Sequence, residues 1–136
     1  MTETEDNRAL IANVMAELER GNPRPFVDAM ADDVRWTCPG PSTWARTFEG
    51  KPAVLGDLLG FVRSQLVAHV QLTPRRILAD GDHVVVQARG EATTKRGAPY
   101  NNDYCFIYRL AHGKIVEVLE YMDTQLAATA LVPPPA

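Results

Sequence analysis

The chain has 136 residues, of which 46% are hydrophobic and 23% are charged, and its formal net charge is -3. These values are typical of one globular domain, because two domains of half this length would each be too small to bury a useful core. The negative net charge and the lack of a basic stripe argue against a nucleic-acid partner. No apolar run approaches the roughly 20 residues of a membrane helix, which argues against a membrane partner.

The first ten residues, MTETEDNRAL, are acidic where a signal peptide is basic and then apolar, so we expect a cytoplasmic protein. In a reducing compartment Cys38 and Cys105 are expected to be small buried side chains and not a disulfide. The three histidines form no HxxxH or HxH pair, and neither cysteine has a partner at metal-ligand spacing. We therefore expect neither a metal site nor a cofactor.

The first elements in chain order are predicted to be two helices. Thr2 and Glu5 can form a capping box, after which apolar residues recur at helical spacing as far as Gly21. A second short helix carries Phe26 and Met30. The following pair of aspartates, at 32 and 33, is expected to end it.

A half-buried strand comes next, because Val34, Trp36 and Cys38 alternate with polar residues. Residues 39–50 read as a loop that begins with Pro-Gly-Pro-Ser. Two large aromatic residues, Trp44 and Phe48, are unusual in a solvated loop. We therefore expect this loop to fold over another part of the molecule.

A third helix is predicted to begin at Pro52, which suits a first helical turn, and to continue to about Leu66. The pattern then changes to period two, and tight turns separate four predicted strands, at residues 67–79, 82–94, 99–111 and 114–122. Helices that all precede an antiparallel meander predict the α+β class. The domain is expected to span residues 1–131, followed by a disordered proline-rich tail at 132–136.

The turn between the last two strands decides which residues lie opposite each other. If Gly113 forms a one-residue bulge, Tyr104 lies opposite Glu120. If residues 112 and 113 form a plain two-residue turn, Cys105 lies opposite Glu120 instead. We favour the bulge, because glycine commonly follows a type I turn in the left-handed conformation. One face would then collect aromatic rings and a single carboxylate, Glu120, beside Phe106 and Met122.

Glu120 in apolar surroundings would have a raised pKa, which suits a general acid or base near neutral pH. Arg89 and Glu91 are two residues apart and share a face of their strand, so pairing with the next strand could bring them close to Glu120. An arginine between two carboxylates could hold a water molecule or a substrate oxygen. The alternatives are an exposed glutamate, a structural ion pair between Glu120 and an arginine, and a solvated row of charges.

Residues 99–127, PYNNDYCFIYRLAHGKIVEVLEYMDTQLA, resemble the final hairpin of SnoaL-like proteins in the nuclear-transport-factor-two-like superfamily. The DDVRW strand and the FEGKPAVLGDLL start of the third helix are similar too. The resemblance implies a cone-shaped roll, in which a curved mixed or antiparallel sheet wraps around N-terminal helices. It also implies a small apolar or polyketide-like ligand in the mouth of the cone, and a homodimer that packs sheet to sheet.

Known activities of the superfamily map onto this chain only in part. Phe106 stands where ketosteroid isomerase has its protonated aspartate, which argues against steroid isomerisation. Glu120, and Arg89 with Glu91, resemble the Asp–Arg–Asp cluster of limonene-1,2-epoxide hydrolase, but Trp36 and Cys38 replace its water-orienting tyrosine and asparagine. The fold alone does not select among these chemistries.

We therefore expect an isomerase, cyclase or hydrolase that uses general acid–base chemistry in an apolar pocket. Its expected catalytic residues are Glu120, Arg89 and Glu91. The substrate-binding residues are expected to be Trp36, His69, Asn102, Tyr104, Phe106 and Met122. Two alternatives remain open: a non-catalytic module that binds a small apolar ligand, and a dimerisation or interaction domain.

Overall fold

The N-terminal helix of the computed structural model, which describes residues 2–135, is capped as expected. In α1 (Glu3–Glu19) the Thr2 hydroxyl accepts a hydrogen bond from the Glu5 N–H at 3.2 Å, and the Glu5 carboxylate accepts one from the Thr2 N–H at 3.4 Å. The helix ends at Glu19, just before Gly21, whose φ of 84° suits a residue without a side chain. One face of α1, including Ile11 and Met15, is buried.

The second helix is shorter than expected and leads directly into a strand. Helix α2 (Arg24–Ala29) follows Pro23, and strand β1 (Met30–Cys38) begins at the next residue. The aspartates at 32 and 33 therefore lie inside the strand as exposed residues, and the prediction that they end the helix is wrong. From Val34 onward the alternation of buried and less buried positions is as expected.

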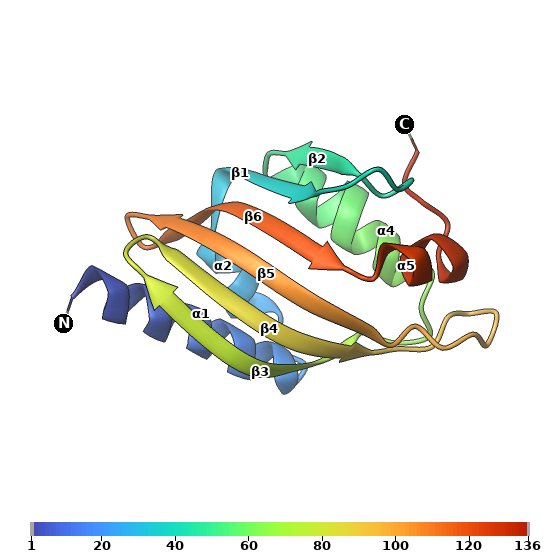
Figure 1. The fold of residues 1–136 in the computed structure, drawn as a ribbon, viewed down its shortest axis with the longest axis horizontal. Helices are drawn as coiled ribbons and strands as arrows, with labels where there is room; N and C mark the ends of the chain where they lie inside the picture. The colour runs from blue at the N-terminus through green and yellow to red at the C-terminus, as the bar shows by residue number, and fades with distance from the viewer. Residues whose placement is uncertain (1, 136) are drawn as a thin grey trace.

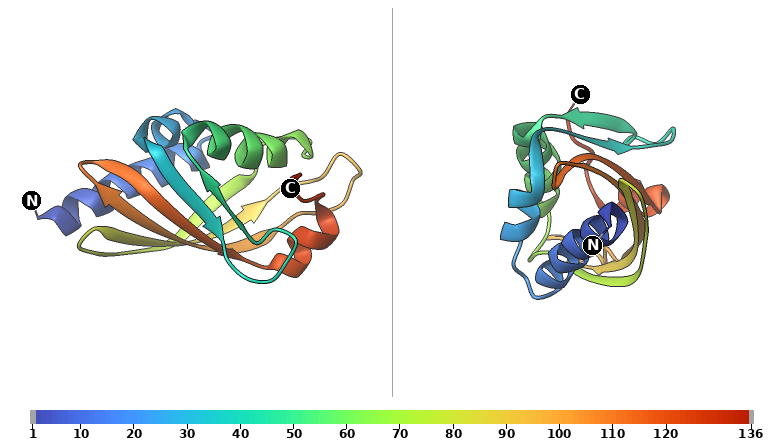
Figure 2. Two further views of the ribbon diagram at one scale, coloured as in Figure 1. Left: turned by 90° about the horizontal axis from the view of Figure 1, so that it is seen from above. Right: turned by 90° about the vertical axis from the view of Figure 1, so that its left-hand side faces the viewer.

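A six-stranded curved sheet forms the body of the molecule, in the order β2-β1-β6-β5-β4-β3. Neighbouring strands are antiparallel except β1 and β6, which are parallel, so the sheet is mixed. The sheet curls around α1 and its two edges do not meet (Figures 1 and 2). The strands not yet described are β2 (Arg46–Glu49), β3 (Gln71–Asp80), β4 (His83–Glu91), β5 (Asn102–Ala111) and β6 (Lys114–Met122).

Part of the expected loop at 39–50 is the edge strand β2. It pairs with β1 through the register Trp36 opposite Phe48. Both Trp44 and Phe48 are 2% exposed, as expected for a segment that folds over the core. The pairing could not be predicted from alternation because β2 has only four residues.

The third predicted helix is one continuous element with a widened middle. It comprises α3 (Lys51–Ala53), a π-helical segment η1 (Val54–Gly60) and α4 (Phe61–Ser64). A Cβ atom at Gly60 would lie 2.9 Å from the Leu55 carbonyl oxygen, so the widened turn requires glycine there. π-Helical turns of this kind are frequent at functional sites.

The hairpin between β5 and β6 differs from both predicted registers. His112 and Gly113 have φ values of 52° and 73° and form a plain two-residue turn, with Ala111 opposite Lys114. The bulge lies instead beside Arg109, where the register shifts by one residue. Together they place Phe106, and neither Tyr104 nor Cys105, opposite Glu120. The face predicted to carry Glu120 and the aromatic rings is nevertheless the one that lies inward.

A last helix, α5 (Thr124–Ala130), was not assigned from the sequence. Asp123 caps it, because its carboxylate accepts a hydrogen bond from the Leu126 N–H at 3.1 Å. Beyond the helix, the backbone N–H and C=O of Val132 bond to the Gln65 side chain at 2.7 and 2.9 Å. Met1 and Ala136, the ends of the predicted domain and tail, lie outside the described residues.

Candidate functional site

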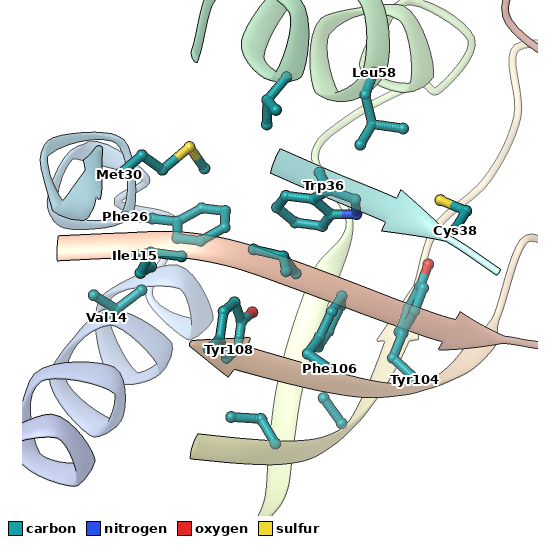
Figure 3. Packing of buried hydrophobic residues seen from close by; sticks show 14 of the residues in the cluster. Val14, Phe26, Met30, Trp36, Cys38, Leu58, Tyr104, Phe106, Tyr108 and Ile115 are labelled. Atoms are coloured by element: carbon teal, nitrogen blue, oxygen red, sulfur yellow. The ribbon is translucent and has the colours of Figure 1, made fainter. Parts of the chain in front are cut away.

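A cavity of about 390 Å³ lies between the inner face of the sheet and the helices. Aromatic side chains from β5 form one wall and point toward Trp36 of β1 (Figure 3). Leucines of η1, with Val62 of α4, close the opposite side. Its size falls within the range of small-molecule pockets, and its walls are mainly apolar, as is usual for such sites.

The carboxyl group of Glu120 lies in this wall. The Trp36 indole N–H donates a hydrogen bond to Glu120 Oε1 at 2.9 Å, and the Cys38 thiol lies 3.5 Å from the same oxygen. These donors come from β1, whose parallel register sets Trp36 opposite Val118 and so brings Cys38 level with Glu120. No other acidic residue among residues 2–135 lines the cavity.

The second carboxyl oxygen of Glu120, Oε2, accepts no hydrogen bond from residues 2–135. Within the same residues, Trp44 Nε1 is the only fully enclosed side-chain nitrogen or oxygen atom without a partner. Oε2 therefore keeps accessible surface. Because Glu120 lines the cavity, this oxygen is open to a bound molecule.

Burial raises the pKa of Glu120 above the ordinary range of a glutamate, and the hydrogen bonds from Trp36 and Cys38 offset part of this effect. The charged form is disfavoured because the surrounding walls are apolar. A raised pKa brings a carboxyl group closer to neutral pH, where a general acid or base works best. Burial likewise raises the pKa of the Cys38 thiol, which therefore stays protonated as a donor.

Aromatic rings on β5 form a row beneath Glu120. Phe106 stacks on Tyr104 with ring centroids 5.1 Å apart and on Tyr108 at 5.8 Å, and the Trp36 ring meets Phe106 edge-on at 6.2 Å. The Tyr104 hydroxyl donates to the Tyr100 hydroxyl at 3.4 Å. Burial raises the pKa of all three tyrosines, so their hydroxyl groups remain protonated donors.

Asn102, expected to bind substrate, has a structural role. It is 1% exposed and does not line the cavity. Its side chain accepts from the Asp123 N–H at 3.0 Å and donates to the Asp123 carbonyl at 3.1 Å and to the Tyr100 hydroxyl at 3.3 Å. These bonds fasten the start of β5 to the end of β6 and orient Tyr100.

The other expected binding residues all line the cavity: Trp36, His69, Tyr104, Phe106 and Met122. His69 is the one of these five residues that is exposed. The sulfur of Met122 lies 3.9 Å from the Tyr100 hydroxyl. The structure thus gathers these side chains around one space, together with Glu120.

Arg89 and Glu91 lie on the other face of the sheet, and the expected cluster with Glu120 does not form. Val84, Val86 and Ala88 of β4 point inward, so the odd-numbered residues of that strand point outward. The register sets Arg89 opposite Asp103, and its guanidinium pairs with that carboxylate at 3.2 Å. The expected juxtaposition with Glu120 is therefore wrong, because strand alternation overrides proximity along the sheet.

Sequence reasoning missed several lining residues. Tyr108 shares the even-numbered face of β5 with Phe106, and Tyr100 continues the same alternation just before the strand begins, so this pattern could have included both. Cys38, which contacts Glu120 but does not line the cavity, was assigned only a packing role, because nothing in the sequence pairs β1 with β6. Trp44 also lines the cavity, yet its Nε1 is enclosed without a partner among the described residues.

Two further observations bear on the kind of site. Within residues 2–135 no group of three or more His, Cys, Asp or Glu side chains is placed to hold a metal ion. None of the helices described is both long enough and apolar enough to cross a membrane.

Comparison with solved structures finds proteins that share this fold over nearly the whole chain. An NTF2-like protein of unknown function from Burkholderia pseudomallei shares 21% identity over 97% of this chain and 99% of its own, with a TM-score of 0.79. An NTF2-like protein from Burkholderia xenovorans shares 25% identity over 95% and 98%, with a TM-score of 0.71. TerC, co-crystallised with polyporic acid, shares 24% identity over 92% and 97%, with a TM-score of 0.75.

A search of curated proteins finds no match. The family model of the SnoaL-like domain matches residues 11–118. These residues include the whole sheet except the end of β6. This match covers most of the chain, and the NTF2-like structures named above share the overall fold of the chain. The chain therefore belongs to the SnoaL-like domain family, and it has the fold of the NTF2-like proteins.

Proposed function

We propose that the chain is an enzyme that acts on a small, mostly apolar molecule, with Glu120 as its general acid or base. The observation that carries this proposal is the state of the Glu120 carboxyl group. Trp36 and Cys38 hold Oε1, whereas Oε2 is open to the cavity. A fixed carboxyl group with a raised pKa and one open oxygen is the arrangement that proton transfer to a bound substrate requires.

The protonation states around Glu120 suggest how the reaction proceeds. Ionised Glu120 removes a proton from the substrate, and Oε2 returns it at another atom. The Tyr108 hydroxyl makes no hydrogen bond with residues 2–135 and keeps accessible surface, because it is not among their enclosed unpaired atoms. It can therefore donate to an oxygen that gains negative charge. Such chemistry serves an isomerase, a cyclase or a hydrolase.

The comparison with TerC bears on the kind of ligand. TerC has been crystallised with polyporic acid, which is consistent with an organic ligand in a fold of this shape. The apolar walls here select by shape, so the substrate is expected to be a molecule that fits about 390 Å³.

The test is the Glu120→Gln variant, which keeps the size of the side chain and removes its titrating proton. Wild type and variant are screened against epoxide, enone and polyketide-like substrates. We expect turnover to fall by about 100-fold to 10,000-fold, as is typical for loss of a general acid or base. The matched control is Glu117→Gln, on the same strand but paired with Arg109 on the outer face.

If Glu120→Gln keeps full activity on a substrate of the wild type, the proposed role of Glu120 is wrong. If the wild type binds small apolar molecules tightly but turns none over, the chain is a binding module. If it neither binds nor turns over any of them, an interaction domain is the better description.

We also propose that the outer face of the sheet mediates a homodimer. Leu78 and Tyr121 are 57% and 48% exposed there, and both border a groove that also includes Val85 and Cys105. Apolar side chains that are exposed together often mark a protein interface. Sedimentation equilibrium of the wild type and of Tyr121→Glu is the test. A monomeric wild type at micromolar concentration contradicts the proposal.

A further inference from the structure

The opening of the cavity differs in charge from its interior. Among the lining residues, Gly21, Pro23, Gly60 and His69 are exposed, so we take them to mark the side from which a ligand enters. Arg63 of α4, which is half-buried, also lines this space. The only acidic residue among the described lining residues is Glu120, on β6. The less buried part of the lining, which we take as the entrance, therefore carries a cation and an imidazole. The interior carries a carboxyl group whose charged form is disfavoured.

The charge of Arg63 has no acidic partner among residues 2–135. Its guanidinium donates to the Leu66 carbonyl at 3.0 Å, and no carboxylate of the described residues lies within 4.0 Å. Arg89 and Arg109 on the outer face, by contrast, each pair with a carboxylate. A guanidinium has five N–H donors, and the bond to Leu66 uses one of them. The remaining donors can meet a ligand.

A bound molecule that carries an anionic group interacts favourably with both Arg63 and the apolar interior in one orientation only. An anion beside Glu120 would raise its pKa further and would lie among apolar walls, which is unfavourable. The same anion beside Arg63 gains a charge-assisted hydrogen bond and stays partly hydrated. The charge distribution therefore orients the ligand, with its apolar body inward.

We propose that the natural substrate has an aromatic or alicyclic body and one carboxylate or similar anionic group, and that Arg63 binds this group at the cavity entrance. The proposal rests on the proposed function for its inner end, where the body meets Glu120. Arg63 is then a specificity-determining residue and takes no part in proton transfer. His69, at the same opening, can donate a second hydrogen bond through its ring N–H.

Two fluorescent probes test this assignment, because they differ only by an anionic group. Anilinonaphthalene sulfonate carries a sulfonate on a phenyl-naphthylamine body, and N-phenylnaphthylamine is the same body without it. Binding of each is measured by fluorescence titration with the wild type, Arg63→Gln and Arg63→Lys. We expect Arg63→Gln to weaken binding of the sulfonate probe about tenfold and binding of the neutral probe less than about twofold. Arg63→Lys should restore part of the affinity for the sulfonate probe.

The matched control is Arg76→Gln, which changes the net charge equally but lies on the outer groove. An equal effect of Arg76→Gln and Arg63→Gln on the sulfonate probe would show a general charge effect and overturn the proposal. The proposal is also overturned if Arg63→Gln binds the sulfonate probe as tightly as the wild type does, or if the wild type does not bind this probe. Leu58→Trp, which fills the cavity, must weaken both probes; if it does not, they bind elsewhere and the proposal fails.

The outcome is independent of the test of Glu120, because the measurement is binding and not turnover. Loss of activity in Glu120→Gln with unchanged probe discrimination supports both proposals. A fully active Glu120→Gln variant with retained discrimination by Arg63 overturns only the proposed function.

Discussion

Strands β4, β5 and β6 carry ionisable side chains on both the inner and the outer face of the sheet. The groups that stabilise these side chains differ between the two faces. On the outer face Arg89 pairs with Asp103 and Arg109 with Glu117, and all four side chains keep at least 31% of their surface exposed. On the inner face Glu120 has no cationic partner among the described residues and is held by an indole and a thiol.

The difference teaches how position in a sheet decides the chemistry of a charged residue. Water and an opposite charge stabilise an exposed carboxylate, so its proton is lost in the ordinary range. A carboxyl group that faces an apolar cavity is stabilised by keeping its proton. Neighbouring residues of one strand therefore differ in function, because alternation sends one to solvent and the next to the cavity.

The largest expected effect of a substitution is loss of packing on the inner face. Phe106→Ala removes a ring that contacts Tyr104, Tyr108 and Trp36 and is 6% exposed. We expect a loss of about 3 kcal/mol in the free energy of unfolding, measured with urea. The control is Ile107→Ala, on the half-buried outer face, which should lose less than half as much. Equal losses would contradict the assignment of the core to the inner face.

An intermediate effect is expected from Trp36→Phe, which removes the indole N–H from Glu120. Because that hydrogen bond lowers the pKa of Glu120, its loss should raise the pKa further. A pKa above its unfolded value makes stability fall as pH rises, from about 4.3 up through the folded pKa. Over this rise in pH, we expect the free energy of unfolding of the variant to fall by about 1–3 kcal/mol more than that of the wild type.

Urea unfolding of both proteins between about pH 4 and pH 8 measures this difference. Trp44→Phe is the matched control, because Trp44 Nε1 donates to no partner among residues 2–135. If Trp44→Phe changes the pH dependence as much as Trp36→Phe does, the hydrogen bond to Glu120 is not the cause.

The smallest effect is expected for the ion pair on the outer face. Arg89→Ala should reduce the free energy of unfolding by about 0.2–1 kcal/mol, since Asp103 is 79% exposed and water replaces the lost partner. A double-mutant cycle with Asp103→Ala measures the coupling. Activity should be unchanged, because neither residue reaches the cavity. A large loss of activity in Arg89→Ala would restore the catalytic role expected from the sequence.

Local patterns predicted much of the fold and one side of the site. The capping box at Thr2 and Glu5, the alternation in β5 and the family resemblance all depend on residues close together in the chain. They are sufficient to place Phe106 and Tyr104 on one face of their strand, whereas the register of the hairpin decides that Glu120 shares this face. The strand β2 was missed, because four residues are too few to show a period, and α5 was not assigned.

Register was the point at which prediction failed. A plain turn at His112 and Gly113 combined with a bulge beside Arg109 gives a pairing that neither simple alternative contains. The position of a bulge depends on how the whole sheet twists and packs, and not on the residues of the turn alone. The same dependence explains why Arg89 could not be assigned a partner from its spacing.

The sequence left open which face of the last hairpin lies inward, because that depends on the register of the two strands. By itself it determined the α+β class, the alternation of side chains along the last two strands, and Glu120 as a carboxylate among apolar residues on one face of its strand. Each follows from short-range periodicity, which the covalent geometry of helices and strands imposes. Only the tertiary structure decided that β1 runs parallel to β6, so that Trp36 and Cys38 reach Oε1 of Glu120. Those contacts join residues 84 and 82 positions apart, and only packing of the complete sheet brings such distant residues together.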